Sequence, residues 1–215
     1  MSENSYSKNN FRDFFEGVWK EIGKTQQRDF LKNEGELQCV LYSKIIKKIK
    51  TWGLSCWVEP TLLLQNKKGK KFKLKPDMLI LEKPDVVKCI IELKFTTPYV
   101  AFEYDWIKFY QIHTFNPKLS DQKLNLEKLD WFIFAYVDNG IGDNGVCDSA
   151  VGTREKVKTF LDKGKPSGGE DCWRPRFNDA DLPDLKWLKG IYIHAHGELN
   201  RNDWEIYVFD KKENL

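Results

Sequence analysis

The sequence PDMLILEKPDVVKCIIELKF, residues 76–95, decides the fold of this chain. Its two apolar runs are joined by Lys83-Pro84-Asp85, and proline suits the second position of a turn. The second run is nearly continuous in apolar residues, which is typical of a strand that is covered on both faces. The segment therefore predicts a β-hairpin, with one strand over 72–82 and a central strand over 86–95.

The turn also predicts which side chains face each other across the hairpin. If the Pro84-Asp85 dipeptide is the centre of the turn, Asp77 lies opposite Glu92, with Cβ atoms about 4.5–5.5 Å apart. Two carboxylates at that separation repel each other and require a compensating cation. Lys94 follows two residues after Glu92 and shares its face, because side chains alternate along a strand. We therefore expect two carboxylates and one ammonium group on one side of the hairpin.

Helices are predicted on both sides of the hairpin. Apolar residues recur at helical spacing over 11–23 and again over 102–115. Between these segments, Asn33 is an N-cap for a further helix that runs to about Trp52, with Gly53 as its stop signal.

Further strands are predicted from runs of apolar and β-branched residues. These runs cover 57–65, 131–137, 191–195 and 204–209, with a loop over 138–152 and irregular structure over 164–185. The order of the elements predicts a single α/β domain over 1–215, with a central mixed β-sheet flanked by helices.

The composition and net charge limit which binding partners and which cellular location are expected. The chain has 215 residues, of which 41% are hydrophobic, so it can form one core of ordinary size. The net charge of +3 is too small for a chain-wide basic field, and any affinity for nucleic acid must come from local patches. No apolar run approaches the roughly 20 residues that span a bilayer, and the polar N-terminus lacks the apolar core of a signal peptide, so no membrane association is expected. The five cysteines are scattered without a CxxC pair, which disfavours a disulfide framework and favours a cytoplasmic location.

The hairpin carboxylates suggest a chemistry. Hard oxygen ligands in small number suit Mg²⁺, which takes its remaining ligands from water and phosphate. A metal ion at this position activates water and neutralises charge on a scissile phosphate, and a neighbouring lysine orients the attacking water.

A known family carries the same residues. Pro76-Asp77, fourteen intervening residues and Glu92-Leu93-Lys94 resemble the PD-(D/E)XK motif of restriction-endonuclease-like nucleases. The resemblance covers about residues 30–137 and implies a restriction-endonuclease-like core, with the helix 11–23 and the part 138–215 as additions.

The resemblance also implies roles for the motif residues. Asp77 and Glu92 would be catalytic and would bind Mg²⁺, or Mn²⁺ as a substitute, together with the backbone carbonyl of Leu93. Lys94 would position the nucleophilic water.

Members of the family often add an acidic residue from the preceding helix. On a helical wheel, Glu34 falls in the middle of the face that Leu37 and Leu41 form, with Gln38 one turn further along, whereas Glu36 falls beside its edge. We therefore expect Glu34 to be catalytic and to bind the metal. The alternative is that Glu34 is a first-turn carboxylate that the helix dipole stabilises.

The helix after the lysine strand carries polar residues at three-residue spacing. The resemblance implies that Lys108 contacts a phosphate and that Gln111 orders a water or a base. The alternative for Lys108 is a surface ion pair with Asp105.

A basic segment between residues 66 and 75 leads directly into Pro76-Asp77. Its lysines, next to a metal site, are predicted to hold the phosphate backbone, and the alternative is a solvated turn. The lysines predicted to bind nucleic acid are Lys67, Lys68, Lys70, Lys71 and Lys73. A second possible metal site is the pair His194 and His196, which share a strand face, but no third ligand is evident nearby.

These features predict a metal-dependent deoxyribonuclease that hydrolyses phosphodiester bonds, either a restriction endonuclease or a repair or phage nuclease. Its partners would be DNA and a second copy of the chain, because a double-strand cut needs two active sites. The alternative is a non-catalytic nucleic-acid- or protein-binding module on the same fold. Such modules usually lose the acid or the lysine, and Asp77, Glu92 and Lys94 are all present here.

Overall fold

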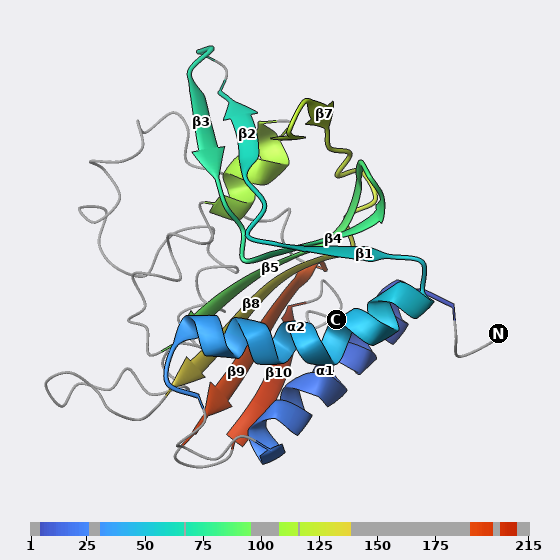
Figure 1. Cartoon of the computed structure of the whole chain (residues 1–215), viewed down its shortest axis with the longest axis vertical. Helices are drawn as coiled ribbons and strands as arrows, with labels where there is room; N and C mark the ends of the chain where they lie inside the picture. The colour runs from blue at the N-terminus through green and yellow to red at the C-terminus, as the bar shows by residue number, and fades with distance from the viewer. Residues whose placement is uncertain are drawn as a thin grey trace, which may run out of the picture.

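The computed structural model describes residues 5–25, 31–66, 68–95, 108–115, 117–138, 190–199 and 203–209. These residues form two long helices, a six-stranded mixed sheet and a separate four-stranded sheet (Figure 1). The predicted α/β class with a mixed sheet and flanking helices is confirmed at this level.

The two helices follow their sequence signals closely. Helix α1 (Lys8–Thr25) buries the apolar stripe that includes Phe15 and Trp19. Helix α2 (Glu34–Thr51) begins after Asn33, whose side chain accepts a hydrogen bond from the backbone N–H of Glu36 at 2.9 Å. It ends before Gly53, which adopts a φ of 73°, a backbone conformation that glycine tolerates without steric cost. Both predicted helices are therefore confirmed.

The large sheet has the strand order β1-β4-β5-β8-β9-β10. Strand β8 is parallel to β5 and to β9, and the other neighbouring pairs are antiparallel. The strands predicted over 131–137, 191–195 and 204–209 correspond to β8, β9 and β10. The bounds are β1 (Ser55–Val58), β4 (Met78–Lys83), β5 (Val86–Phe95), β8 (Trp131–Asp138), β9 (Tyr192–Glu198) and β10 (Asp203–Phe209).

The β4–β5 hairpin has the register that its turn predicts. Met78 pairs with Ile91 and Ile80 with Cys89. Two register shifts closer to the turn offset each other, so the last pair, Lys83 with Val86, returns to the same alignment. Because β4 begins one residue after Asp77, continuing this register brings Asp77 opposite Glu92.

The second sheet has the order β3-β2-β6-β7 and is antiparallel throughout. Its strands are β2 (Leu62–Gln65), β3 (Lys71–Leu74), β6 (Lys118–Leu119) and β7 (Gln122–Lys123). The single strand predicted over 57–65 is wrong, because the chain leaves the large sheet after β1 and enters the small one at β2. The single strand predicted over 72–82 is wrong for the same reason, since β3 and β4 belong to different sheets.

Each break coincides with a proline. Glu59 has a φ of 47° and precedes Pro60, and Pro76 lies between β3 and β4. A proline has no N–H for the strand ladder, so β1 ends shortly before Pro60 and β3 shortly before Pro76.

The large sheet is covered on both faces. Helices α1 and α2 lie across one face, where their apolar residues pack with Ile91, Leu93 and Ile133 (Figure 1). On the other face, Ile90 and Phe132 pack with the small sheet and with Phe109 of a helical segment at 108–114.

Several expectations concern residues outside these ranges. The helix predicted over 102–115 is described only from 108 onward, and the loop and irregular segment predicted over 138–152 and 164–185 lie almost wholly outside the described residues. No helix of the described part is long and apolar enough to cross a membrane.

Candidate active site

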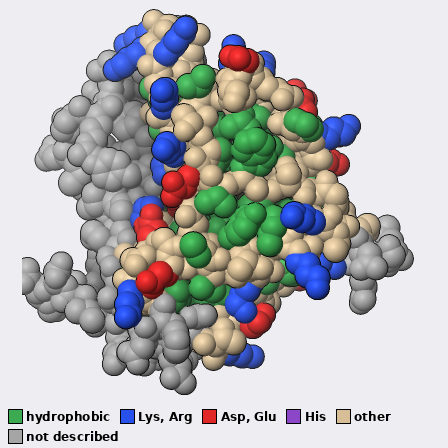
Figure 2. Space-filling view, viewed as in Figure 1, with side chains coloured by type: hydrophobic (Ala, Val, Ile, Leu, Met, Phe, Trp, Pro, Cys, Tyr) green, Lys and Arg blue, Asp and Glu red, His purple; other side chains and the backbone are tan. Residues whose placement is uncertain are grey.

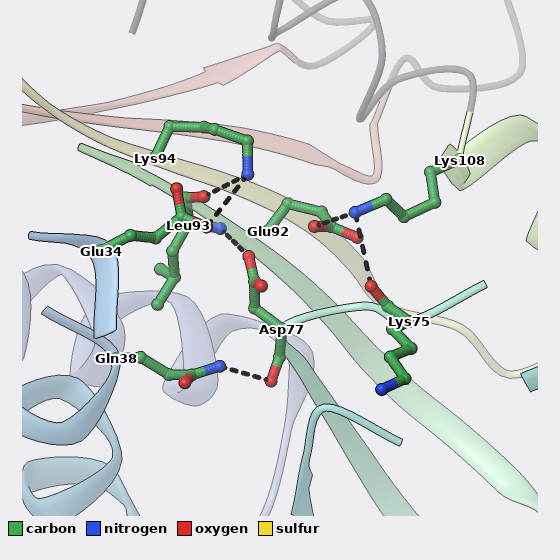
Figure 3. A network of polar contacts seen from close by, with 8 residues as sticks. All are labelled: Glu34, Gln38, Lys75, Asp77, Glu92, Leu93, Lys94 and Lys108. Atoms are coloured by element: carbon green, nitrogen blue, oxygen red, sulfur yellow. Dashed lines mark hydrogen bonds and ion pairs between the residues drawn. The ribbon is translucent and has the colours of Figure 1, made fainter. Parts of the chain in front are cut away.

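Asp77 lies at the point where β4 begins, between α2 and the end of β5. Its carboxylate Oδ2 accepts a hydrogen bond from the backbone N–H of Leu93 at 2.5 Å. Its backbone carbonyl accepts two more, from the side-chain Nε2 of Gln38 at 3.1 Å and from the N–H of Glu59 at 2.9 Å. The backbone and the carboxylate of Asp77 are therefore both held in place (Figure 3).

Glu92 is fully buried, on the face of β5 opposite to the two long helices. Its Oε2 forms an ion pair with Nζ of Lys108 at 2.7 Å, and the same ammonium group donates to the carbonyl of Lys75 at 3.4 Å. Burial of a carboxylate is costly unless it is paired, so the helical segment at 108–114 contributes a cation that this position needs.

Lys94 links the end of β5 to the start of α2. Its Nζ donates to the carbonyl oxygen of Leu93 at 2.7 Å and lies 3.4 Å from Oε1 of Glu34. Figure 3 shows the carboxylates of Glu34, Asp77 and Glu92, with Lys94 and Lys108, gathered around Leu93 near the end of β5.

Glu34 is the acidic residue of α2 that reaches the site, as the helical wheel predicts. Glu36 instead turns back toward its own helix N-terminus, where its Oε2 accepts from the backbone N–H of Lys32 at 2.7 Å. Glu34 also lies in the first turn of α2, so its position suits both a site residue and a carboxylate stabilised by the helix dipole.

The structure thus brings most of the expected residues to one place, and these are Glu34, Asp77, Glu92, Leu93, Lys94 and Lys108. Gln111 lies one turn after Lys108 on the same helical segment. The alternative partner Asp105 is outside the described residues. The sequence analysis did not predict that the backbone N–H of Glu59 holds the carbonyl of Asp77. The one signal for it is Pro60, which disfavours a continuous strand through Glu59.

The basic segment is placed differently. Lys68, Lys70, Lys71 and Lys73 are exposed on the β2–β3 hairpin, and no hydrogen bond or ion pair of the described residues joins them to the carboxylates. Lys67 lies outside the described residues. The hairpin projects from the body of the molecule (Figure 1).

The donor atoms of the site suit a hard divalent cation. Carboxylate oxygens and a backbone carbonyl are the ligands that Mg²⁺ takes from proteins. Within the described part of the chain, however, no group of three or more His, Cys, Asp or Glu side chains lies close enough to hold a metal ion. The ammonium groups of Lys94 and Lys108 contact the oxygens of Leu93, Glu34 and Glu92 instead. A divalent cation that binds these oxygens would have to displace the two lysine ammonium groups.

His194 and His196 are buried on β9, on the same face of the sheet as Glu92. Their rings lie 5.7 Å from those of Phe134 and Tyr136, respectively, on the neighbouring strand. The two imidazoles therefore extend the aromatic packing of this face.

Comparison with known proteins adds no relative: no protein-family model, no curated protein and no solved structure matches this chain. The functional assignment therefore depends on the residues of this site.

Proposed function

We propose that this chain is a metal-dependent deoxyribonuclease of the PD-(D/E)XK type. The observation that supports the proposal is the meeting of Asp77, Glu92 and Lys94 at the adjoining ends of two antiparallel strands. A further support is the order helix, three strands, helix and strand, which α2, β1, β4, β5, the helical segment at 108–114 and β8 follow when the small-sheet strands β2, β3, β6 and β7 are taken as insertions.

In this proposal Asp77 and Glu92 would hold Mg²⁺ or Mn²⁺, together with the carbonyl oxygen of Leu93 and with Glu34. The ion, when bound, supplies positive charge that offsets the charge of the scissile phosphate. The N–H of Leu93 already fixes the orientation of the Asp77 carboxylate through Oδ2, and the carboxylate keeps further lone pairs for a cation.

The two lysines act on the substrate side. Lys94 would donate a hydrogen bond to the attacking water and orient it toward phosphorus, and Lys108 would be available to a phosphate oxygen when its contact with Glu92 is given up to a cation. The oxygen of the water forms a bond to phosphorus, the bond from phosphorus to the 3′ oxygen breaks, and a proton passes to that oxygen. The products are a 5′-phosphate and a 3′-hydroxyl. A second copy of the chain would supply the second active site that a double-strand cut needs.

Cleavage of supercoiled plasmid and of end-labelled oligonucleotides, with Mg²⁺ or Mn²⁺, tests the proposal directly. We expect wild-type protein to cut and Glu92→Gln and Lys94→Ala to lose roughly 10²–10³-fold in rate, the loss typical when one group that stabilises a transition state is removed. Glu127→Gln and Lys128→Ala are matched controls, because both residues are exposed and distant in sequence from the motif.

Metal binding is measured separately, from the thermal unfolding midpoint with and without Mg²⁺. A rise that disappears in Asp77→Asn supports the metal site, because a ligand that binds only the folded state stabilises it. No cleavage of duplex, single-stranded or branched DNA, together with no metal-dependent shift, would favour the alternative, a non-catalytic binding module.

A further inference from the structure

The small sheet presents a row of side chains that share one face. Lys73 of β3 is opposite Leu63 of β2, Leu63 is opposite Lys118 of β6, and Lys118 is opposite Lys123 of β7. Directly opposed residues of neighbouring strands point to the same side of a sheet. One row therefore carries three lysines across four strands.

Lys71 adds a fourth lysine to the same face. It lies two residues before Lys73 on β3 and is opposite Gln65 of β2. We call the set Lys71, Lys73, Lys118 and Lys123 the lysine face; all four residues are exposed.

The opposite side of this sheet is apolar and packed. Leu62, Leu64, Phe72 and Leu74 contact the cluster that includes Phe109. The lysine face must therefore point away from the core. None of the ion pairs among the described residues involves its four lysines. Lys68 and Lys70 add two exposed lysines near the end of the hairpin, where Figure 2 shows blue side chains gathered.

The spacing of the strands separates the lysines into two columns. Lys71 and Lys73 lie on β3, whereas Lys118 and Lys123 lie on β6 and β7. Neighbouring strands are about 4.8 Å apart, so β3 lies roughly 10 Å from β6 and roughly 14 Å from β7. The uncharged strip of Leu63 and Gln65 lies between the columns. This separation is close to the major-groove width of B-DNA, about 12 Å, across which the phosphates of the two strands face each other.

We propose that the lysine face binds duplex DNA, with one column of lysines against the phosphates of each strand. The inference rests on the proposed function for its choice of DNA as the polyanion. The duplex is favoured over a single strand because the face carries lysines, a leucine and a glutamine, whereas proteins that bind single strands stack bases on aromatic rings.

The lysine face is connected directly to the candidate active site. After β3 ends at Leu74, the chain continues through Lys75, whose carbonyl accepts from Lys108, and reaches Asp77 two residues later. A duplex held by β3 is therefore bound next to the carboxylates that are proposed to cut it.

The test is the salt dependence of binding to a short labelled duplex in EDTA, where no metal-dependent cleavage takes place. The double variants Lys118→Gln/Lys123→Gln and Lys71→Gln/Lys73→Gln each remove one column. Each phosphate contact contributes about 0.9 to the slope of log affinity against log salt, so each variant is expected to reduce the slope by about 1.8. The control Lys47→Gln/Lys50→Gln removes the same charge from exposed positions of α2 and should keep the wild-type slope.

Two results would overturn the inference. One is a slope in the column variants that equals the slope of the α2 control. The other is an equal loss on single-stranded DNA and on the duplex, since a face that spans a groove must lose its preference for the duplex when either column is removed. Cleavage by the wild-type protein is assayed separately, so protein that binds through this face without cutting refutes the proposed function alone.

Discussion

Among the single contacts of the site, the ion pair between Glu92 and Lys108 is expected to contribute most to the stability of the fold. The carboxylate is completely buried, whereas the lysine side chain is 21% exposed. A buried charge that loses its partner is strongly destabilising, because the remaining ion is poorly solvated.

We therefore expect Lys108→Met to lower the free energy of unfolding by about 3 kcal/mol, the lower end of the range for breaking a buried pair, since the lysine keeps some solvent contact. Urea unfolding without metal measures this loss. Lys128→Met, at an exposed position, should change stability by less than about 0.5 kcal/mol. Equal stabilities of the two variants would contradict the prediction.

Tyr6 forms a second, half-buried network near the N-terminus. Its hydroxyl donates to Oδ2 of Asp130 at 2.6 Å, and Lys88 contacts both the carboxylate and the tyrosine ring. Burial, followed by the hydrogen bond to Asp130, raises the pKa of Tyr6 far above its usual value of 10.0.

This shift predicts a loss of stability at alkaline pH. Above about pH 10 the tyrosine ionises in the unfolded chain but stays protonated in the folded one, so the folded state binds more protons and stability falls as the pH rises. The slope from this residue is up to about 1.4 kcal/mol per pH unit. Tyr6→Phe should unfold more readily at pH 8 and decline less steeply above pH 10 in urea titrations. An unchanged alkaline slope would show that Tyr6 does not cause it.

At the scale of elements, local signals determined the helix ends and the central hairpin. Asn33 and Gly53 mark α2 because a cap and a positive φ are needed at those two positions. The alternation of side chains and the Pro84-Asp85 turn were sufficient to predict that Asp77 and Glu92 come together. The positions of the apolar residues around the axis of α2 were sufficient to predict that Glu34, and not Glu36, faces the site.

Other parts of the fold depend on distant packing and were not predicted. The runs 57–65 and 72–82 have strand composition throughout, but each is shared between two sheets. Strands β6 and β7 have two residues each, too few to leave a periodic pattern. The pairing of Lys108 with Glu92 requires a helical segment to pack on the sheet, which no local pattern near Lys108 specifies.

The N-cap of α2 provides a prediction at this scale. Asn33→Ala removes the acceptor for the N–H of Glu36 and should cost about 1 kcal/mol of stability in urea unfolding. Because Glu34 lies in the first turn, fraying there also loosens its contact with Lys94. Asn33→Asp retains an acceptor and is the matched control. A loss as large in Asn33→Asp as in Asn33→Ala would refute the capping role.

At the scale of the whole molecule, the first helix and the last strands close one side of the large sheet. The rings of Trp19 and Trp204 lie 4.8 Å apart, and the indole N–H of Trp19 donates to the carbonyl of His196 at 2.9 Å. A Cβ on Gly23 would lie 2.2 Å from the Trp204 ring, and one on Gly197 would lie 2.8 Å from it. The two glycines therefore allow α1 and β9 to approach this indole.

Gly23→Ala is accordingly expected to destabilise the fold by about 1–3 kcal/mol through overpacking. Gly17→Ala, on the same helix, has no atom within 4 Å of the added Cβ and should stabilise it by roughly 0.5–1 kcal/mol. Urea unfolding compares the two. The double variant Gly23→Ala/Trp204→Leu should recover part of the loss, and a Gly23→Ala protein as stable as Gly17→Ala would exclude a tight contact at Trp204.

The same contact has a consequence for synthesis on the ribosome. Trp19 and His196 are 177 residues apart. At about 5–20 residues per second, roughly 9–35 s pass between the synthesis of one and the other. During that interval the apolar stripe of α1 has no β9 or β10 to pack against, and it is exposed to chaperones and to neighbouring nascent chains. The contacts that α1 makes with β9 and β10 are therefore among the last of the large sheet to form.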